Sequence, residues 1–191
     1  MANKVKFGLK NVHVWPIMNE TADTVEYGEV INVPGAVELT LDASGDSMEF
    51  YADDTIYYSQ YANNGYEGSL TIALIPEDFE VKIMDNIKDT NGAIVENKDA
   101  KPKNYAMAFE FDGDKNKTRH ILYNVNSSRP SVEGKTTEDS NEPTTDTISL
   151  KAIPAKDTGY IKAKLAEGQT GYDTFFTAPY EVVPNTESTE A

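Results

Sequence analysis

The feature that most constrains the fold of this chain is a series of short runs rich in Val, Ile, Tyr, Phe and Thr. Gly, Pro or paired Asn and Asp interrupt these runs about every ten residues. Such spacing is typical of all-β sandwiches and barrels. We therefore predict a mainly β protein, a β-sandwich or barrel, with one flanking α-helix at about residues 77–88 and a long hairpin loop.

Three runs alternate between apolar and polar residues: AVELTLD at 36–42, EGSLTIAL at 67–74 and TISLKA at 147–152. Because successive side chains of a strand point to opposite sides, each run is predicted to have a core face and a polar face. The predicted core face comprises Val37, Leu39, Leu41, Leu70, Ile72, Leu74, Ile148, Leu150 and Ala152. The predicted polar face comprises Glu38, Thr40, Asp42, Glu67, Ser69, Thr71, Thr147, Ser149 and Lys151.

The run YAMAFEF at 105–111 differs, because its second face carries only the small residues Ala106 and Ala108 before Glu110. A small apolar face indicates close cover by another element. The following residues, FDGDKNKTRHILY, predict a hairpin with Asp112-Gly113 near its turn. Asp112, Asp114 and Asn116 imitate the start of an EF-hand loop, but Lys117 and Tyr123 stand where the motif needs Gly and Glu, so a turn is the better interpretation.

Helix signals follow Pro76, which suits the first helical position, and acidic residues fill the first turn. Phe79, Ile83 and Ile87 then recur at helical spacing, with Met84 beside them. Asn91-Gly92 marks the loop after this helix. We expect the helix to pack on the flank of the sandwich.

Residues 1–183 are expected to form one domain, in which residues 43–64 protrude as a hairpin loop and residues 131–147 form a polar loop. Residues 184–191 are expected to be a flexible tail. The hairpin loop is rich in tyrosine, a residue that supplies rigid contact area with a polar end. An ordinary core hairpin and a contact hairpin are equally compatible with this composition.

Composition narrows the range of functions. The chain of 191 residues has no cysteine, which excludes disulfides and thiolate metal sites, and no apolar run as long as the roughly 18 residues of a membrane span. Its formal net charge of −15 repels nucleic acid and anionic membranes. This charge is explained either by solubility alone or by a surface that faces polyanions without adhering to them.

The sequence offers little catalytic chemistry. His13 and His120 are the only histidines, and neither has a recognisable nucleophile partner. Glu49, Asp53 and Asp54 could serve as paired carboxylates of a glycosidase, but a solvated or interfacial loop is the simpler interpretation. We therefore predict no enzymatic activity, no cofactor and no metal.

Several segments in a fixed order resemble the major tail proteins (tail tube proteins) of long-tailed siphovirus-type bacteriophages, the nearest set infecting Gram-positive hosts. The segments, between about Lys4 and Pro154, are Gly45-Asp46, EFYADD (49–54), Tyr57, NNGYEGSLTIALIPEDF (63–79), AFEFDGDK (108–115), RHILYN (119–124), Arg129-Pro130 and TDTISLKAIP (145–154). The part after Pro154 matches less recognisably.

The resemblance implies a structural virion protein that forms stacked, hexameric rings, and thereby the tail tube through which the genome is delivered. It implies contacts with the tape measure, tail terminator and distal tail proteins, passage of DNA without specific binding, and no membrane partner. The location implied is the virion tail, with the host cytoplasm during assembly. In the resembled family the corresponding hairpin reaches the adjoining ring, which makes Glu49, Phe50, Tyr51, Asp53, Asp54, Tyr57 and Tyr58 candidate inter-ring contacts.

If a sheet lines such a tube, its polar face meets DNA. The candidate lumen residues are Glu38, Thr40, Asp42, Glu67, Ser69 and Thr71, none of them basic. Lys151 is an exception, which either pairs with an acid or lies off the lumen. The alternatives are a non-enzymatic carbohydrate-binding β-sandwich module and a jelly-roll glycosidase; the solitary tryptophan, Trp15, argues against both.

Overall fold

The computed structural model describes residues 7–131 and 144–184, and this part of the chain is mainly β with one short helix, as predicted. The elements are β1 (Leu9–Glu20), β2 (Val25–Tyr27), β3 (Ile31–Val33), β4 (Ala36–Ser44), β5 (Ser47–Ala52), β6 (Thr55–Tyr61), β7 (Gly65–Ile72), α1 (Glu77–Lys82), β8 (Ile87–Lys88), β9 (Ile94–Val95), β10 (Tyr105–Phe111), β11 (Arg119–Ser127), β12 (Asp146–Ile153) and β13 (Lys162–Leu165).

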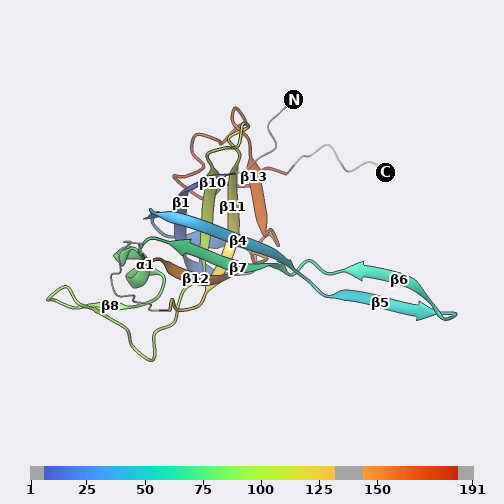
Figure 1. The fold of residues 1–191 in the computed structure, drawn as a ribbon, viewed down its shortest axis with the longest axis horizontal. Helices are drawn as coiled ribbons and strands as arrows, with labels where there is room; N and C mark the ends of the chain where they lie inside the picture. Colours follow the sequence, from blue (N-terminus) through green and yellow to red (C-terminus); the bar gives the residue numbers. More distant parts are fainter. Residues whose placement is uncertain (1–6, 132–143, 185–191) are drawn as a thin grey trace, which may run out of the picture.

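A nine-stranded antiparallel sheet forms the body, in the order β2-β1-β10-β11-β12-β7-β4, with β3 paired to β1 and β13 paired to β11. Strand β11 pairs with β13 over Arg119–Leu122 and with β12 over Asn124–Ser127. It therefore links two halves of the sheet. Figure 1 shows β4, β7 and β12 crossing β1, β10 and β11 at a steep angle, in the manner of a sandwich.

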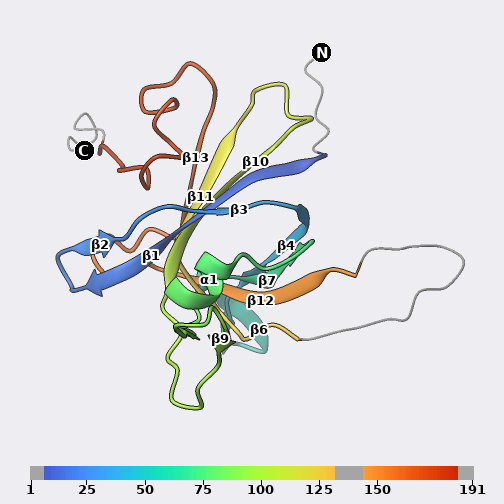
Figure 2. The ribbon, with the colours of Figure 1, turned by 90° about the vertical axis from the view of Figure 1, so that its left-hand side faces the viewer.

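The main core lies between these two halves. Its buried side chains come from β1, β3, β7, β10, β11 and β12, from α1 and from the two residues after α1: Val12, Val14, Ile31, Val33, Leu70, Ile72, Phe79, Ile83, Met84, Tyr105, Met107, Phe109, Leu122, Val125, Ile148, Leu150 and Ala152. The predicted core residues of β12 and two of those of β7 belong to this set. Helix α1 packs its Phe79 ring edge-on against Tyr105, at 5.6 Å between ring centroids. Figure 2 shows α1 in front of the place where the two halves cross.

A second cluster covers the opposite face of β10 and confirms the prediction from its small residues. Ala106 and Ala108 are fully buried. They pack with Trp15, Ile121, Tyr123, Ala155, Leu165, Tyr172 and Phe175. The covering element is the segment after β13, which sequence reasoning placed within the domain without assigning it a position.

The helix is shorter than the predicted span of about 77–88, because it ends after Lys82. Asp85 adopts φ +62°, which no α-helix can continue, and the Asn86 N–H donates to the Glu80 carbonyl. Ile83 and Met84 are buried as the apolar spacing predicted, but Ile87 lies in β8 and is 54% exposed.

Two predicted core residues are exposed. Leu74 is 73% exposed because β7 ends at Ile72 and the chain turns towards α1. Val37 is 59% exposed because an irregularity in the β4–β7 register between Ala36 and Glu38 turns it outwards. Leu39 and Leu41, beyond this bulge, keep the predicted inward direction and are half-buried.

Two further predictions concern a loop and the end of the chain. Most of the predicted polar loop at 131–147 and the predicted tail at 184–191 lie outside the described residues. The polar loop ends earlier than predicted, because Asp146 and Thr147 belong to β12.

Truncation of Ile72 tests the assignment of the faces of β7. The side chain has no exposed surface and lies in the main core. Ile72→Ala removes buried methyl groups and leaves a cavity, so we expect a loss of about 2–5 kcal/mol in the free energy of unfolding. Urea denaturation of both proteins measures it, and Leu74→Ala is the matched control, with a much smaller loss expected. A loss below about 0.5 kcal/mol for Ile72→Ala contradicts the assignment.

Candidate functional site: the hairpin ribbon and the polar sheet face

Strands β5 and β6 form a two-stranded hairpin, the hairpin ribbon (Ser47–Tyr61), that extends away from the body (Figure 1). It continues the β4–β7 pair, because the Ala62 N–H donates to the Asp46 carbonyl and the Asn64 N–H to the Ser44 carbonyl, each at 2.9 Å. Gly45 permits the close approach at its base, where a Cβ atom would lie 1.8 Å from the Ala62 carbonyl oxygen. The ribbon is therefore an extension of the sheet that backbone hydrogen bonds hold in place.

The tip of the ribbon is a tight turn. Asp53 and Asp54 have φ +52° and +58°, the left-handed values that a two-residue hairpin turn of type I′ requires. Asp and Asn adopt these values more readily than most residues. The turn thus fixes the register of the ribbon and also places two carboxylates at its far end.

The ribbon exposes large side chains on both faces. The exposed large side chains are Met48, Phe50, Tyr51, Ile56, Tyr57, Tyr58 and Tyr61. All the candidate inter-ring residues lie here and are exposed: Glu49, Phe50, Tyr51, Asp53, Asp54, Tyr57 and Tyr58. An isolated two-stranded hairpin is marginally stable in water, and a contiguous exposed apolar surface marks an interaction site. The ribbon therefore has the character of a contact arm.

The glycosidase interpretation of the acidic residues has no geometric support. Glu49 accepts a hydrogen bond from the Tyr51 hydroxyl at 2.7 Å, and this bond raises the pKa of Tyr51. Asp53 and Asp54 lie at the exposed tip. Glycosidic cleavage needs two carboxyl groups facing each other across a bound sugar. A ribbon exposed on both faces does not enclose one.

A second surface, the polar sheet face, spans β4, β7 and β12 on the side away from the main core. Its residues align in three rows across the strands: Glu38, Thr71 and Thr147; Thr40, Ser69 and Ser149; Asp42, Glu67 and Lys151. All six candidate lumen residues therefore lie together on one face. They are exposed or half-buried. The hydroxyls of Thr71 and Thr147 share a hydrogen bond of 3.1 Å.

Lys151 pairs with an acid, one of the two outcomes that the sequence left open. Its Nζ lies 2.6 Å from Glu67 Oε1, and the Ser44 hydroxyl donates to the same oxygen at 3.3 Å. The hydrogen bond from Lys151 holds the pKa of Glu67 below its ordinary value. The single lysine of this face is thus neutralised by its neighbour, and the candidate lumen residues remain acidic or hydroxylic.

This pair predicts a measurable titration shift. Lys151→Gln removes the main cause of the lowered pKa, so the pKa of Glu67 is expected to rise towards its ordinary value in an NMR titration of side-chain carboxyl carbons. A lowered folded-state pKa contributes stability above the unfolded-state pKa that is lost as pH falls through the folded-state pKa. Because both side chains are half exposed, overall stability is expected to change little. An unchanged Glu67 titration in the variant contradicts the pairing.

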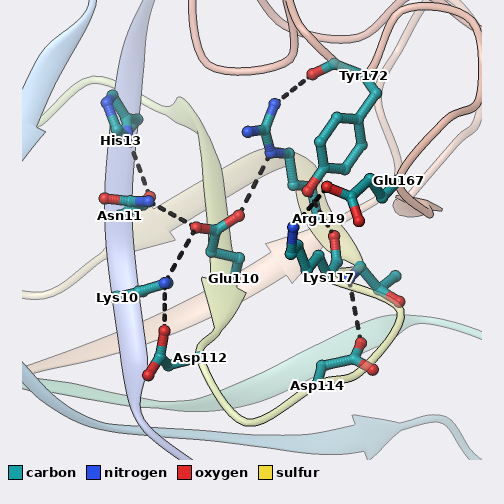
Figure 3. Close-up of polar contacts among 11 residues, drawn as sticks. Lys10, Asn11, His13, Glu110, Asp112, Asp114, Lys117, Arg119, Glu167 and Tyr172 are labelled. Carbon is teal, nitrogen blue, oxygen red and sulfur yellow. Dashed lines mark hydrogen bonds and ion pairs between the residues drawn. The ribbon is translucent and has the colours of Figure 1, made fainter.

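The segment after β13, here called the C-terminal segment, is fixed to the sheet by a cluster of charged residues (Figure 3). Glu110, which is largely buried, accepts from the Asn11 amide at 2.6 Å and from Arg119 Nε at 3.3 Å. The Arg119 guanidinium donates to the Tyr172 carbonyl and lies 3.8 Å from the centroid of the Tyr172 ring. Lys117 pairs with Glu167 at 2.6 Å.

The role of this cluster is structural. Tyr172 also donates its hydroxyl to the Lys117 carbonyl at 2.8 Å, so the segment is held by ion pairs, a stacked cation and backbone acceptors together. Sequence reasoning did not find it, because Glu167 and Tyr172 lie 50 and 53 residues after their partners Lys117 and Arg119, and only the small face of β10 indicated a covering element. Both histidines pack against rings: His13 against Phe176 at 4.7 Å and His120 against Phe109 at 5.3 Å between centroids.

The C-terminal segment also closes one side of a cavity of about 500 Å³. Its aromatic wall consists of Trp15, Tyr27, Tyr123, Tyr160 and Tyr180. Asp157 and Glu181 line it as well, and burial, followed by the negative charges of Asp157 and Glu20, raises the pKa of Tyr27 to about 12.

Residues 7–131 and 144–184 contain neither a metal-binding cluster nor a membrane-spanning helix. No group of three or more His, Cys, Asp or Glu side chains in these ranges could hold a metal ion. Asp114, one of the EF-hand-like residues, instead accepts backbone N–H bonds from Asn116 and Thr118 at 3.0 and 3.1 Å and so shapes the β10–β11 turn. No helix in the described ranges has the length and apolar character needed to cross a membrane.

Comparison with known proteins gave no match to a protein-family model and no match to a curated protein sequence. Among solved structures, the chain is similar to the tube-terminating cap of the anti-feeding prophage, with a TM-score of 0.50 and 10% identity over 87% of this chain and 95% of that one. It was also aligned with the sheath/tube terminator of an extracellular contractile injection system, PVC, in the extended state, with a TM-score of 0.44 and 10% identity over 86% and 100% of the two chains. The first of these likenesses establishes a shared fold.

Proposed function

We propose that this chain is a structural protein of a phage-type tail, which assembles into stacked, hexameric rings that form the tail tube. In this role the polar sheet face lines the channel through which the genome passes. The protein needs no cofactor and catalyses no reaction. Its location is the virion tail, after assembly in the host cytoplasm, and its partners are further copies of itself and the tape measure, tail terminator and distal tail proteins.

The observation that carries this proposal is that the β4–β7 pair supports two uncovered surfaces, the hairpin ribbon and the polar sheet face. The outer part of the β4–β7 pair is the hairpin ribbon, whose large side chains lack cover in the described structure. The inner part presents the polar sheet face with its acidic and hydroxyl side chains. A contact arm that continues a solvent-facing sheet suits a subunit whose function lies in assembly.

Two further lines support the proposal. The resemblance of the sequence to siphovirus tail tube proteins and the fold shared with a prophage tube cap both point to tail structures. The name of that cap also favours a second candidate within the same class, a protein that terminates a tube and does not form its length.

Negative-stain electron microscopy of the purified protein distinguishes these candidates. Long tubes with a regular axial repeat are expected for a tube protein, and single rings for a terminator. A protein that stays monomeric over a wide concentration and salt range would overturn both. Adding the purified protein to tubes of a homologous system separates incorporation along the length from capping at one end.

The aromatic cavity favours a candidate of another kind, the carbohydrate-binding module. Tyrosine rings and carboxylates together suit sugar faces and hydroxyl groups, and the volume of about 500 Å³ falls in the range of small-molecule sites. Screening against a glycan library, with Tyr160→Ala as the control variant, tests it. Specific binding that this substitution abolishes would favour this candidate over the structural one.

A further inference from the structure

The cavity beside the C-terminal segment has walls from parts of the chain that are remote in the sequence. Trp15 of β1, Tyr27 of β2 and Tyr123 of β11 line it from the sheet. Tyr160, from the loop between β12 and β13, and Tyr180, from the C-terminal segment, complete a set of five rings that we call the aromatic cage. The volume of about 500 Å³ is large enough for a small organic group to enter between these rings.

Several hydroxyl groups of the lining already donate to the protein itself. Tyr27 donates to the Tyr123 carbonyl at 3.3 Å, and Tyr123 donates to the Tyr180 carbonyl at 2.9 Å. The Thr158 hydroxyl donates to Asp157 Oδ1 at 3.2 Å. Because a hydroxyl has one proton to donate, these groups offer a ligand no donor, and the rings present their faces instead. A sugar, which needs donors for its own oxygens, suits this lining less well than a ligand that needs only ring faces and negative charge.

The described residues that line the cavity carry negative charge and no positive charge. Asp157 and Glu181 belong to the lining, which includes no Lys, Arg or His. Neither carboxylate forms an ion pair within the described ranges, whereas Glu20 is paired with Lys156 at 2.8 Å. Burial, followed by the charges of Asp157 and Glu20, raises the pKa of Tyr27 to about 12. The Tyr27 ring is therefore uncharged near neutral pH, and the potential around it is negative.

We propose that the aromatic cage is a binding site for an organic cation, an ammonium or guanidinium group that lies against the ring faces and is balanced by Asp157 and Glu181. The faces of Trp and Tyr rings attract cations, most strongly where water is excluded, and the carboxylates add direct attraction of opposite charge. The net charge of −15 also favours the approach of a cation. A free alkylammonium ion and a Lys or Arg side chain of another protein carry the same chemistry. This inference goes beyond the proposed function and does not depend on it.

Matched pairs of charged and neutral probes test the proposal. Trp15 is the only tryptophan of the chain and lines the cavity, so its fluorescence reports binding. Choline is expected to bind at least tenfold more tightly than 3,3-dimethylbutan-1-ol, its neutral analogue of the same shape. The peptide acetyl-Gly-Lys-Gly-amide, compared with the same peptide containing norleucine in place of Lys, tests a side chain as the source. The charged probe that binds more tightly identifies the source of the cation.

Variants of the cavity separate ring faces from hydrogen bonds and charge. Tyr160→Leu is expected to weaken binding of the tighter charged probe about tenfold, whereas Tyr160→Phe keeps the ring face and is expected to bind normally. Asp157→Asn with Glu181→Gln removes both charges while Asn keeps an acceptor for the Thr158 N–H, which Asp157 Oδ1 binds at 2.7 Å. This double variant is expected to lose about tenfold in affinity and most of the salt dependence of binding.

The control variant is Glu49→Gln with Asp53→Asn, which makes the same change in charge on the hairpin ribbon and is expected to bind the probe normally. Equal affinity for the charged and neutral members of both pairs would overturn the inference, as would normal binding by Tyr160→Leu or by the double variant of the cavity. Tube formation is measured separately. If tubes form and no cation binds, only this inference is wrong; if a cation binds and the protein stays monomeric, the proposed function is wrong and the site stands.

Discussion

A variant in which Glu49–Gln60 is replaced by a short Gly-Ser turn is expected to fold normally and form no long tubes. The residues of the ribbon belong to neither core cluster, so their removal leaves the packed body unchanged. They also carry the exposed apolar surface that the proposed stacking needs. Electron microscopy and sedimentation velocity at matched concentrations measure the loss, which is expected to be complete for assemblies longer than one ring.

The control for this variant is its own stability. Thermal unfolding is expected within a few degrees of the unmodified protein, because the β4–β7 ladder ends at Ser44 and Gly65, before the deleted segment. A second control, Phe50→Ser with Tyr57→Ser and Tyr58→Ser, keeps the ribbon but removes three large contacts. It is expected to shorten or abolish tubes. Normal tubes from the deletion variant would show that the ribbon does not stack the rings.

Local patterning predicted most of the fold, because side-chain alternation along a strand is decided by the strand itself. Ile148, Leu150 and Ala152 are buried as predicted, as are Leu70 and Ile72. The small face of β10 correctly predicted a covering element, since only small side chains leave room for one. The long tyrosine-rich hairpin between two core strands was also predicted, and β5 and β6 form it.

The failures share one physical cause, which is that pairing geometry is decided by partners remote in the sequence. The bulge that exposes Val37 depends on the register with β7, and the end of β7 that exposes Leu74 depends on the path to α1. The left-handed backbone of Asp85 ended a helix whose apolar spacing continued to Ile87. Similarly, the contact of Arg119 with Tyr172 joins segments that no local pattern connects.

The polar sheet face leads to the second large effect, on passage of DNA. Glu38→Lys with Glu67→Lys is expected to permit tube assembly but to slow or block genome delivery. Duplex DNA carries a charge about every 1.7 Å along its axis, and each lysine that contacts a phosphate releases counterions and holds the duplex. Glu67 now neutralises Lys151 at 2.6 Å, so its replacement also frees a third lysine on the same face. Repetition around each ring and along the tube would multiply this adhesion.

DNA ejection in vitro from virions that carry the double substitution measures the effect, and raised salt is expected to restore part of the rate because phosphate contacts weaken as salt increases. Asp23→Lys with Glu26→Lys is the matched control: it makes the same change in charge at the exposed β1–β2 hairpin, far from the polar sheet face. Virions with this control are expected to eject DNA at the normal rate. Normal ejection from well-formed tails of the E38K/E67K variant would mean that this face does not line the channel. Slow ejection in both variants would instead attribute the effect to total charge. The two variants change the charge equally, so they differ in ejection rate only if the DNA touches one of the two surfaces and not the other.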